Sequence, residues 1–411
     1  TNRWGSEINT QRLDLATKVG YVFKDMPFQS IGFQNAFTLH DQNSYYGLNV
    51  YDIKQSSFYS NLIFNSIINN TKHKFATGIN FAYDNYNEFV GLTDYGRVDN
   101  SVGAFFEYTY DNDDNFSLVL GGRVDNHNRL GTFVTPRLHL RYNPWEKSVL
   151  RFSAGRGKRA ANIFAENQSL FASSRTFSIL DTDGKIYGLN PEIAWNYGLS
   201  FNQKFQLFGR NGDAGFDLYR TDFQNQAVVD VMQSPQQVLF YNLKGKSYAT
   251  SLQIEFNYEL ANRFSLRSAY KYYDIQTQYL SGVYQRPLQA KHRFFGNLEY
   301  ETGRSESGSQ WRFDATYNWL GKQQLPVTAS NPAQDRLPEF SPSYNLINAQ
   351  VTHVFSSNFE IYVGGENIGN YKQSKAILGA ETPFGPTFDA SIVYAPIFGQ
   401  MYYAGLRFKI K

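Results

Sequence analysis

Side chains that alternate between apolar and polar over long stretches restrict the fold of this chain more than any other feature. In residues 251–260 every second residue is apolar or aromatic, and the same period of two recurs in residues 311–319 and 13–23. Side chains on one face of a β-strand recur with this period. Helical periodicity is nearly absent, so the sequence predicts an all-β fold.

The length of the alternating runs indicates which kind of all-β fold the chain adopts. Several runs reach ten residues or more, whereas strands in soluble sheets usually contain about 5–6 residues. A strand that crosses a membrane at its usual tilt needs about 9–11 residues. One face of each run is apolar with aromatic ends and the other carries charge, as in a transmembrane barrel with lipid outside and a polar lumen inside.

Short segments of turn-forming residues alternate with longer polar links along the chain. Short turns are predicted near residues 24–27, 69–71, 111–114, 143–145, 209–213, 260–262, 302–308 and 356–358. Longer links are predicted near residues 43–56, 87–97, 126–132, 158–190, 227–245, 277–286, 322–343 and 372–397. This alternation is typical of an antiparallel up-and-down transmembrane β-barrel, with tight periplasmic turns and long outer loops. The sixteen connections predict about 17 strands.

An odd number of strands is informative because bacterial single-chain barrels have even strand numbers. The first predicted strand begins on the long-loop side and the last ends on the short-turn side. An odd number of strands is therefore expected upstream of Thr1. We expect residues 1–411 to be the C-terminal part of a barrel of about 22 strands whose lumen holds a plug. The plug and about five strands would precede this chain.

Composition agrees with a membrane barrel and excludes other classes. Mean hydropathy is only −0.47 although 17% of the residues are aromatic. Polar lumen-facing residues keep mean hydropathy low, and aromatic girdles raise the aromatic content. The chain has no cysteine, which excludes disulfides and thiolate metal sites. Its net charge of +3 lacks the basic excess expected of a nucleic-acid-binding protein.

Several segments carry motifs that occur in the same order in one known family. They are residues 153–162 (SAGRGKRAAN), 188–198 (GLNPEIAWNYG), 218–231, 286–292 and 366–371 (ENIGNY). In this order they resemble segments of TonB-dependent outer-membrane receptors, in particular those of Bacteroidetes. Ala161 stands where the family usually has proline. The resemblance implies import of a scarce nutrient, such as a siderophore, haem, cobalamin or a glycan fragment.

The end of the chain resembles the family's last strand. Tyr403, Gly405, Phe408 and Ile410 match the pattern aromatic-x-Gly-x-x-apolar-x-apolar. In the family this pattern is read by the barrel assembly machinery. The family usually ends on an aromatic residue, whereas this chain ends with Ile410 and Lys411.

The resemblance also implies partners. TonB, together with ExbB and ExbD, would pull on a TonB box in the plug and use the proton-motive force. The barrel would lie in the bacterial outer membrane in contact with its lipid. Glycan importers of this type often pair with a surface lipoprotein. No cofactor and no nucleic acid are expected.

The link that begins near residue 158 is the best candidate for a ligand site. Its polar residues are Arg156, Lys158, Arg159, Asn162, Glu166, Asn167 and Arg175. Convergent polar groups on outer loops can give a binding site its specificity. The alternative is that these residues only hold the loop together. A motif shared across the family favours that alternative, because it cannot encode different ligands.

Motifs of enzymes and metal sites are not found. The sequence contains no H-E-x-x-H, G-x-S-x-G or phosphate-binding loop motif. Its six histidines are scattered, so no shared metal site is expected. Other hypotheses are a passive channel, a structural barrel subunit of an outer-membrane complex, a barrel enzyme and a soluble propeller. A propeller would show a repeat of about 40 residues, and none is evident.

Overall fold

One large antiparallel sheet dominates the computed structural model, which describes residues 3–410. Its long strands are β1 (Ser6–Phe23), β2 (Met26–Tyr46), β3 (Asn49–Ile68), β4 (Asn70–Val90), β6 (Arg97–Asp111), β7 (Phe116–His127), β8 (Gly131–Tyr142), β9 (Ser148–Arg159), β11 (Glu192–Leu207), β12 (Arg210–Asn225), β15 (Ser247–Ala261), β16 (Phe264–Tyr279), β18 (His292–Glu301), β19 (Gln310–Leu320), β20 (Tyr344–Ser356), β21 (Phe359–Glu366) and β22 (Met401–Phe408). The sheet has 19 strands, and the two others, β5 (Thr93–Asp94) and β17 (Gly282–Gln285), only extend hairpins. The prediction of about 17 strands is confirmed.

The remaining elements lie in the loops. They are the strands β10 (Thr176–Ile179), β13 (Ala227–Asp230) and β14 (Gln237–Asn242), which form a small second sheet, and the 3-10 helices η1 (Ala165–Phe171) and η2 (Ala333–Asp335). Within residues 3–410, no helix combines the length and the apolar character needed to span a membrane.

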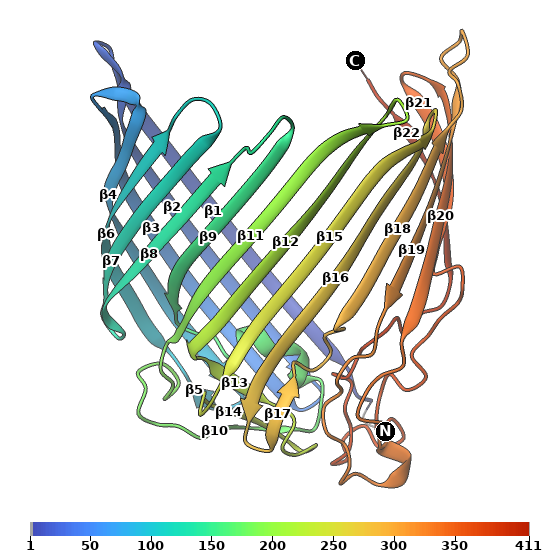
Figure 1. Ribbon diagram of the computed structural model, residues 1–411. Coiled ribbons are helices and arrows are strands. Elements are labelled where there is room, and N and C mark those ends of the chain that lie inside the picture. Colours follow the sequence, from blue (N-terminus) through green and yellow to red (C-terminus); the bar gives the residue numbers. More distant parts are fainter. Residues whose placement is uncertain (1–2, 411) are drawn as a thin grey trace.

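Each long strand pairs with the next long strand along the chain, and the sheet curves round on itself (Figure 1). The long loops gather at the lower end in Figure 1 and the tight turns at the upper end. The chain enters β1 at the loop end and leaves β22 at the turn end. Among the described strands no pairing joins β1 to β22, so the sheet has two free edges.

The membrane-spanning part of the sheet has an apolar and a polar face, as the alternation predicts and as β1 shows. On β1 the apolar face carries Leu13, Leu15, Val19 and Tyr21, whose side chains are 48% to 67% exposed. Apolar side chains so exposed are on the lipid-facing side of a transmembrane barrel. The opposite face, with Asp14 and other polar residues, therefore lines the lumen.

The first four strands are longer than a membrane crossing requires. They contain 18, 21, 20 and 21 residues, compared with about 9–11 for a crossing. Near the loop end their outer faces become polar, for example at Asn9, Asn43 and Lys54, while the backbone pairing continues. These strands therefore extend beyond the apolar belt.

This extension overturns one detail of the sequence prediction. Residues 43–56 were expected to be a long link, but β2 and β3 are joined by a two-residue turn at Gly47 and Leu48. Residues 87–97, 126–132 and 277–286 are likewise mostly strand. The prediction failed because apolar alternation marks only the lipid-facing part of a strand. The other four long links are confirmed as connections between the long strands, although 227–245 contains β13 and β14. The eight turns are also confirmed, although some residues given for them belong to the flanking strands, such as 26–27 of β2, 70–71 of β4, 210–213 of β12 and 260–261 of β15.

The last strand carries the four residues of the expected assembly pattern. Tyr403 donates its hydroxyl to Gln350 Oε1 at 2.9 Å, and Gly405 lies directly opposite Tyr362. Phe408 and Ile410 are 64% and 89% exposed. Lys411 lies outside the described residues. The role of the pattern in assembly stays a prediction.

The packing around position 405 requires a glycine, apart from any role of Gly405 in the assembly pattern. A Cβ at this position would overlap the Tyr362 ring. We expect Gly405→Ala to cost about 1–3 kcal/mol, as overpacking does elsewhere. The fraction of heat-modifiable, folded barrel on gels measures this. Gly122→Ala on β7 is the matched control, because nothing lies within 4 Å of its Cβ position; equal loss in both variants would contradict the packing argument.

Candidate functional site

The long loops pack together into a cap at the loop end of the sheet. The helix η1 places Phe171 beside Phe164. Phe164 packs against Phe240 of β14, and Phe171 stacks on Tyr51 of β3. All four rings are 1% exposed or less. Buried aromatic side chains dominate the energetics of such clusters. The loop between β9 and β11, residues 160–191, is therefore fixed against the wall.

A buried ion pair joins loops that are distant in the sequence. Arg175 donates Nε to Asp389 Oδ2 at 2.9 Å and Nη1 to the carbonyl oxygen of Ser234 at 3.0 Å. The side chains of Arg175 and Asp389 are 1% and 6% exposed. Because β10 also pairs with β14, three loops, residues 160–191, 226–246 and 367–400, form one folded unit.

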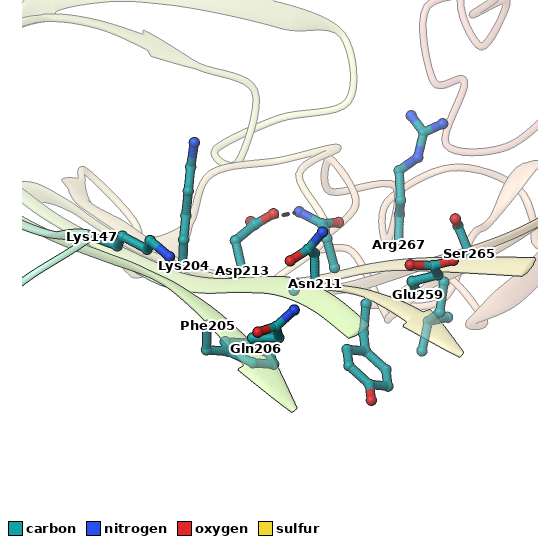
Figure 2. A pocket seen from close by; sticks show the side chains of 13 residues that line it. Lys147, Lys204, Phe205, Gln206, Asn211, Asp213, Glu259, Ser265 and Arg267 are labelled. Atoms are coloured by element: carbon teal, nitrogen blue, oxygen red, sulfur yellow. Dashed lines mark hydrogen bonds between the residues drawn. The ribbon is translucent and has the colours of Figure 1, made fainter. Parts of the chain in front are cut away.

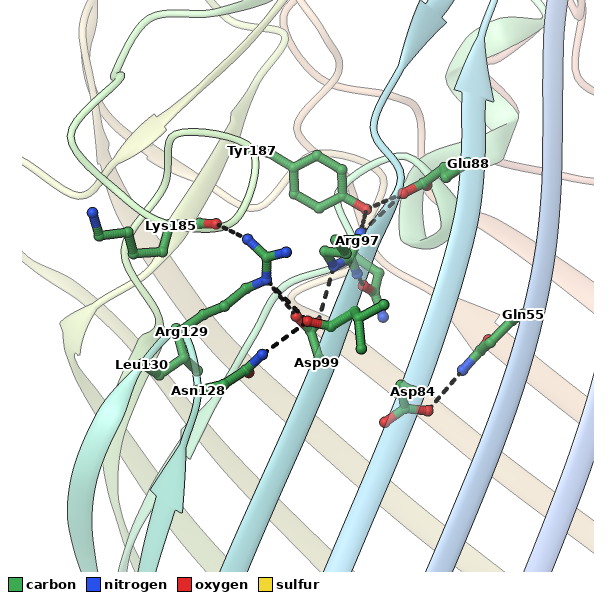
Figure 3. Close-up of polar contacts among 12 residues, drawn as sticks. Gln55, Asp84, Glu88, Arg97, Asp99, Asn128, Arg129, Leu130, Lys185 and Tyr187 are labelled. Carbon is green, nitrogen blue, oxygen red and sulfur yellow. Dashed lines mark hydrogen bonds and ion pairs between the residues drawn. The ribbon is translucent and has the colours of Figure 1, made fainter.

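A second buried network attaches this unit to the wall (Figure 3). Arg97, the first residue of β6, donates Nη1 to Glu88 Oε2 at 3.1 Å and Nε to Asp99 Oδ2 at 3.0 Å. The three side chains are 5%, 0% and 8% exposed. The same Nη1 donates to the Tyr187 hydroxyl at 2.8 Å, and Nη2 donates to Asn162. Arg97 therefore links two wall strands to the loop.

Tyr187 is the loop's main contribution to this network. Burial, followed by the nearby Glu88 carboxylate, raises the pKa of the Tyr187 hydroxyl far above its usual value. The hydroxyl therefore stays protonated and donates to Glu88. A second arginine, Arg129, pairs with Asp99 Oδ1 at 2.9 Å. The buried carboxylates thus have their counter-charges.

Three of the seven residues predicted to bind ligand lie together. Arg159 donates Nη1 and Nη2 to the two carboxylate oxygens of Glu166 at 2.8 and 2.9 Å, and Nε to Glu192 at 2.7 Å. The backbone N–H of Asn162 donates to Glu166 at 3.0 Å. Burial would raise the pKa of Glu166, but these bonds outweigh it and lower that pKa. The Arg159 side chain is still 57% exposed.

The other predicted residues are spread around the cap. Arg156 is opposite Trp195 and donates to Gln224 at 3.2 Å. Lys158 donates to the carbonyl oxygen of Leu130 at 2.9 Å, and Asn167 donates to that of Ile163 at 2.7 Å. The seventh, Arg175, is the buried residue paired with Asp389. All seven thus bond within the chain, and contact with a ligand stays a prediction.

The Arg97 network is not predicted from the sequence. Arg97 and Asp99 are two residues apart and so share one strand face, which is a signal visible in the sequence. No sequence signal brings Glu88 or Tyr187 to them. Within residues 3–410 no group of three or more histidine, aspartate or glutamate side chains could hold a metal ion.

Comparison with protein families identifies the barrel. Residues 1–368, which run from before β1 to beyond β21, match the model of the family described as "TonB dependent receptor-like, beta-barrel". The chain belongs to this family. The resemblance to TonB-dependent receptors is thereby confirmed, and the soluble propeller and the barrel enzyme are set aside. The likeness to the Bacteroidetes branch stays a prediction. The sequence matches none of the curated proteins with which it was compared.

Solved structures share the fold of this TonB-dependent receptor barrel. The ferric enterobactin receptor PfeA of Pseudomonas aeruginosa gives a TM-score of 0.62 at 12% identity, covering 93% of this chain and 62% of that one. The siderophore receptor PirA of the same organism gives a TM-score of 0.63 at 13% identity, covering 98% of this chain and 64% of that one. A structure described as copper transporter OprC gives a TM-score of 0.72 at 12% identity, covering 97% of this chain and 64% of that one. At such identities the likeness shows the fold alone, and the receptor barrel described here spans less than two thirds of each of these chains.

Proposed function

We propose that the full-length receptor imports a scarce nutrient across the bacterial outer membrane by TonB-dependent active transport. The observation that carries the proposal is the family match over residues 1–368. The folded loop cap supports it, because ligand sites are usually pre-formed concave surfaces. TonB with ExbB and ExbD would supply the energy through a plug that lies outside residues 1–411.

We further propose that more strands of the same protein close the barrel. The free edges of β1 and β22 would leave backbone N–H and C=O groups unpaired, which is costly in lipid. Because β1 starts at the loop end and β22 finishes at the turn end, only an odd number of additional strands can join them. Five additional strands would raise the number of long strands from 17 to about 22. Transporter barrels of this size have a plugged lumen.

The apolar belt and the last strand suggest the surroundings of the barrel. Outer-membrane lipid would contact the belt formed by residues such as Leu15 and Val19. The barrel assembly machinery would recognise β22 through Tyr403, Gly405, Phe408 and Ile410. A surface lipoprotein is a further proposed partner, and the loop cap is the part that it would cover.

The ligand would meet the outer side of the cap. Of the seven predicted residues, Arg159 combines a charged group with high exposure, whereas Arg175 is buried. A ligand with oxygen acceptors could take the guanidinium N–H donors of Arg159. Siderophores, haem, cobalamin and glycan fragments all present such acceptors, and PfeA and PirA are described as receptors for siderophores.

Uptake measurements test the proposal. Cells that express the full-length receptor are given labelled ferric siderophores, copper, haem, cobalamin or oligosaccharides. We expect uptake of one of these, and we expect it to disappear without TonB or after addition of a proton uncoupler. Uptake that persists at the same rate under both conditions would instead support a passive channel. No uptake of any solute would support a structural barrel subunit.

A further inference from the structure

An open apolar hollow of about 560 Å³ lies on the wall across β6, β7, β8 and β9. Its floor consists of small or flat side chains, Gly122 on β7, Pro136 on β8 and Ala154 on β9. Gly122 is directly opposite Pro136, and nothing lies within 4 Å of a Cβ placed on Gly122. Phe106 and Leu120 border the hollow. Three neighbouring strands thus carry small side chains at adjoining positions, which creates the hollow.

The hollow opens toward the lipid rather than toward the lumen. On β11, whose Trp195 borders the hollow, Figure 2 shows Phe205 on one side of the sheet and Lys204 projecting from the other. Trp195 lies an even number of residues before Phe205 in an unbroken part of the strand, so the two share a face. Phe106 and Leu120 are 50% and 45% exposed, as expected of the apolar belt. A lipid acyl chain can therefore reach the hollow.

Aromatic side chains mark the depth of one rim of the hollow. Trp195 and Tyr197 stack near the loop end of β11, with ring centroids 6.3 Å apart. Trp and Tyr gather where the hydrocarbon meets the headgroups. Arg156 is directly opposite Trp195 and two residues from Ala154 on β9, so it shares their outward face. Arg156 therefore lies beside the hollow at the depth of the headgroups of the outer leaflet.

Arg156 has guanidinium donors that are free to bind a further group. Its Nε donates to Gln224 Oε1 at 3.2 Å, whereas its two Nη atoms make no hydrogen bond or ion pair within residues 3–410. Arg220 on the same outer face is instead paired with Asp222 at 2.7 Å. Lys158, further along β9, donates to a backbone carbonyl oxygen at 2.9 Å. A guanidinium with two free nitrogen atoms can bind a phosphate through paired hydrogen bonds.

We propose that the hollow holds one acyl chain of an outer-leaflet lipid whose phosphate group is bound by Arg156. Lipid tails are as apolar as the wall, so the hydrophobic effect gives no preference for this position. The preference comes from the phosphate–guanidinium pair and from close packing, because atoms that line a void lose dispersion contacts. A flexible chain can follow the floor of the hollow. A second copy would present another outward-curving wall (Figure 1), which fits a concave surface poorly.

The lipid site is separate from the import of a nutrient. Arg156, which the polar loop sequence predicts to contact an imported ligand, is thereby assigned to a lipid. The site depends on the side of the sheet that faces the bilayer and not on active transport. A receptor that binds the lipid but imports nothing would therefore reject the proposed function and support the lipid site.

Native mass spectrometry of the full-length receptor tests the site. Receptor in detergent is mixed with phosphatidic acid or with diacylglycerol that has the same acyl chains, and the fraction of receptor that carries one lipid is measured. We expect phosphatidic acid to be retained roughly tenfold more than diacylglycerol, as the gain of one charge-assisted pair predicts. Arg156→Gln should abolish this difference. Gly122→Leu, which fills the hollow, should lower the retention of both lipids.

Three variants serve as controls. Arg220→Gln removes an arginine that is on the same outer face but already paired, and Ala349→Leu enlarges a lipid-facing side chain on β20, outside the hollow. Both should retain phosphatidic acid as the wild type does. Arg156→Lys, which keeps the charge, should preserve part of the preference for phosphatidic acid and so separates loss of charge from misfolding.

Four results would overturn the inference. Equal retention of the two lipids by the wild type would show that the phosphate is not recognised. Unchanged retention by R156Q or G122L would show that the lipid binds elsewhere. An equal loss in A349L and G122L would show that any change of the wall disturbs loosely bound lipid. A dimer mass that disappears in G122L would show that a second copy occupies the hollow.

Discussion

An Arg97→Met receptor is expected to lose the attachment of the β9–β11 loop to the wall. The substitution leaves Glu88 and Asp99 buried without their shared partner, and breaking a buried ion pair in this way costs about 3–5 kcal/mol. Arg97 also holds Tyr187 and Asn162 of the loop. Hydrogen exchange of residues 160–191 in the purified full-length receptor measures the effect. We expect protection in this segment to fall while the β15–β16 hairpin stays protected.

The first strand provides a matched control for Arg97. Arg12 and Asp14 have the same two-residue spacing as Arg97 and Asp99 and are bonded at 2.7 Å, but their side chains are 58% and 54% exposed. Exposed pairs contribute about 0–1 kcal/mol. Arg12→Met should therefore leave the exchange pattern nearly unchanged. Equal effects of the two substitutions would show that burial of the network does not determine loop attachment.

The second large effect is expected from Arg175→Met. This substitution leaves Asp389 buried and unpaired, again at a cost of about 3–5 kcal/mol. Because the pair joins three loops, we expect residues 226–246 and 367–400 to lose protection together with residues 160–191. Limited proteolysis of the full-length receptor provides a second measurement, since loops released from the cap become accessible to protease.

A double substitution distinguishes the charge from the packing at Arg175. Replacing a buried ion pair by apolar residues is often neutral, so R175M/D389L should recover most of the lost protection. Arg267→Met, which breaks the Arg267–Glu299 pair with side chains 59% and 32% exposed, should have little effect on the cap. If the double variant were no more stable than R175M, the cost would come from packing rather than from an unpaired charge.

Much of the wall could be predicted from the sequence because lipid imposes a simple rule on it. Residues such as Leu252, Ile254 and Phe256 must face the bilayer, and their period fixes strand, face and number of crossings. The rule applies only to residues that lie within the bilayer. Asn43 and Lys54 belong to paired strands beyond the apolar belt, so their polar sequence predicts a loop where the chain continues as strand.

The candidate site was less predictable because its contacts are long-range. The proximity of Arg159, Asn162 and Glu166 follows from short separations in the sequence. The partners of Arg97 and Arg175 do not, since Arg175 and Asp389 are 214 positions apart. Their pairing depends on which loops the curved sheet brings together, and no local periodicity encodes it.

The sequence of the gene upstream of Thr1 tests the central claim most directly, since the claim is that this barrel belongs to a plugged, energised importer. The account predicts a signal peptide, a plug of domain size with a TonB box, and an odd number of further alternating strands that would lie between β1 and β22 and close the barrel. A reading frame with no plug, or with an even number of additional strands, would contradict it and leave a passive or structural barrel.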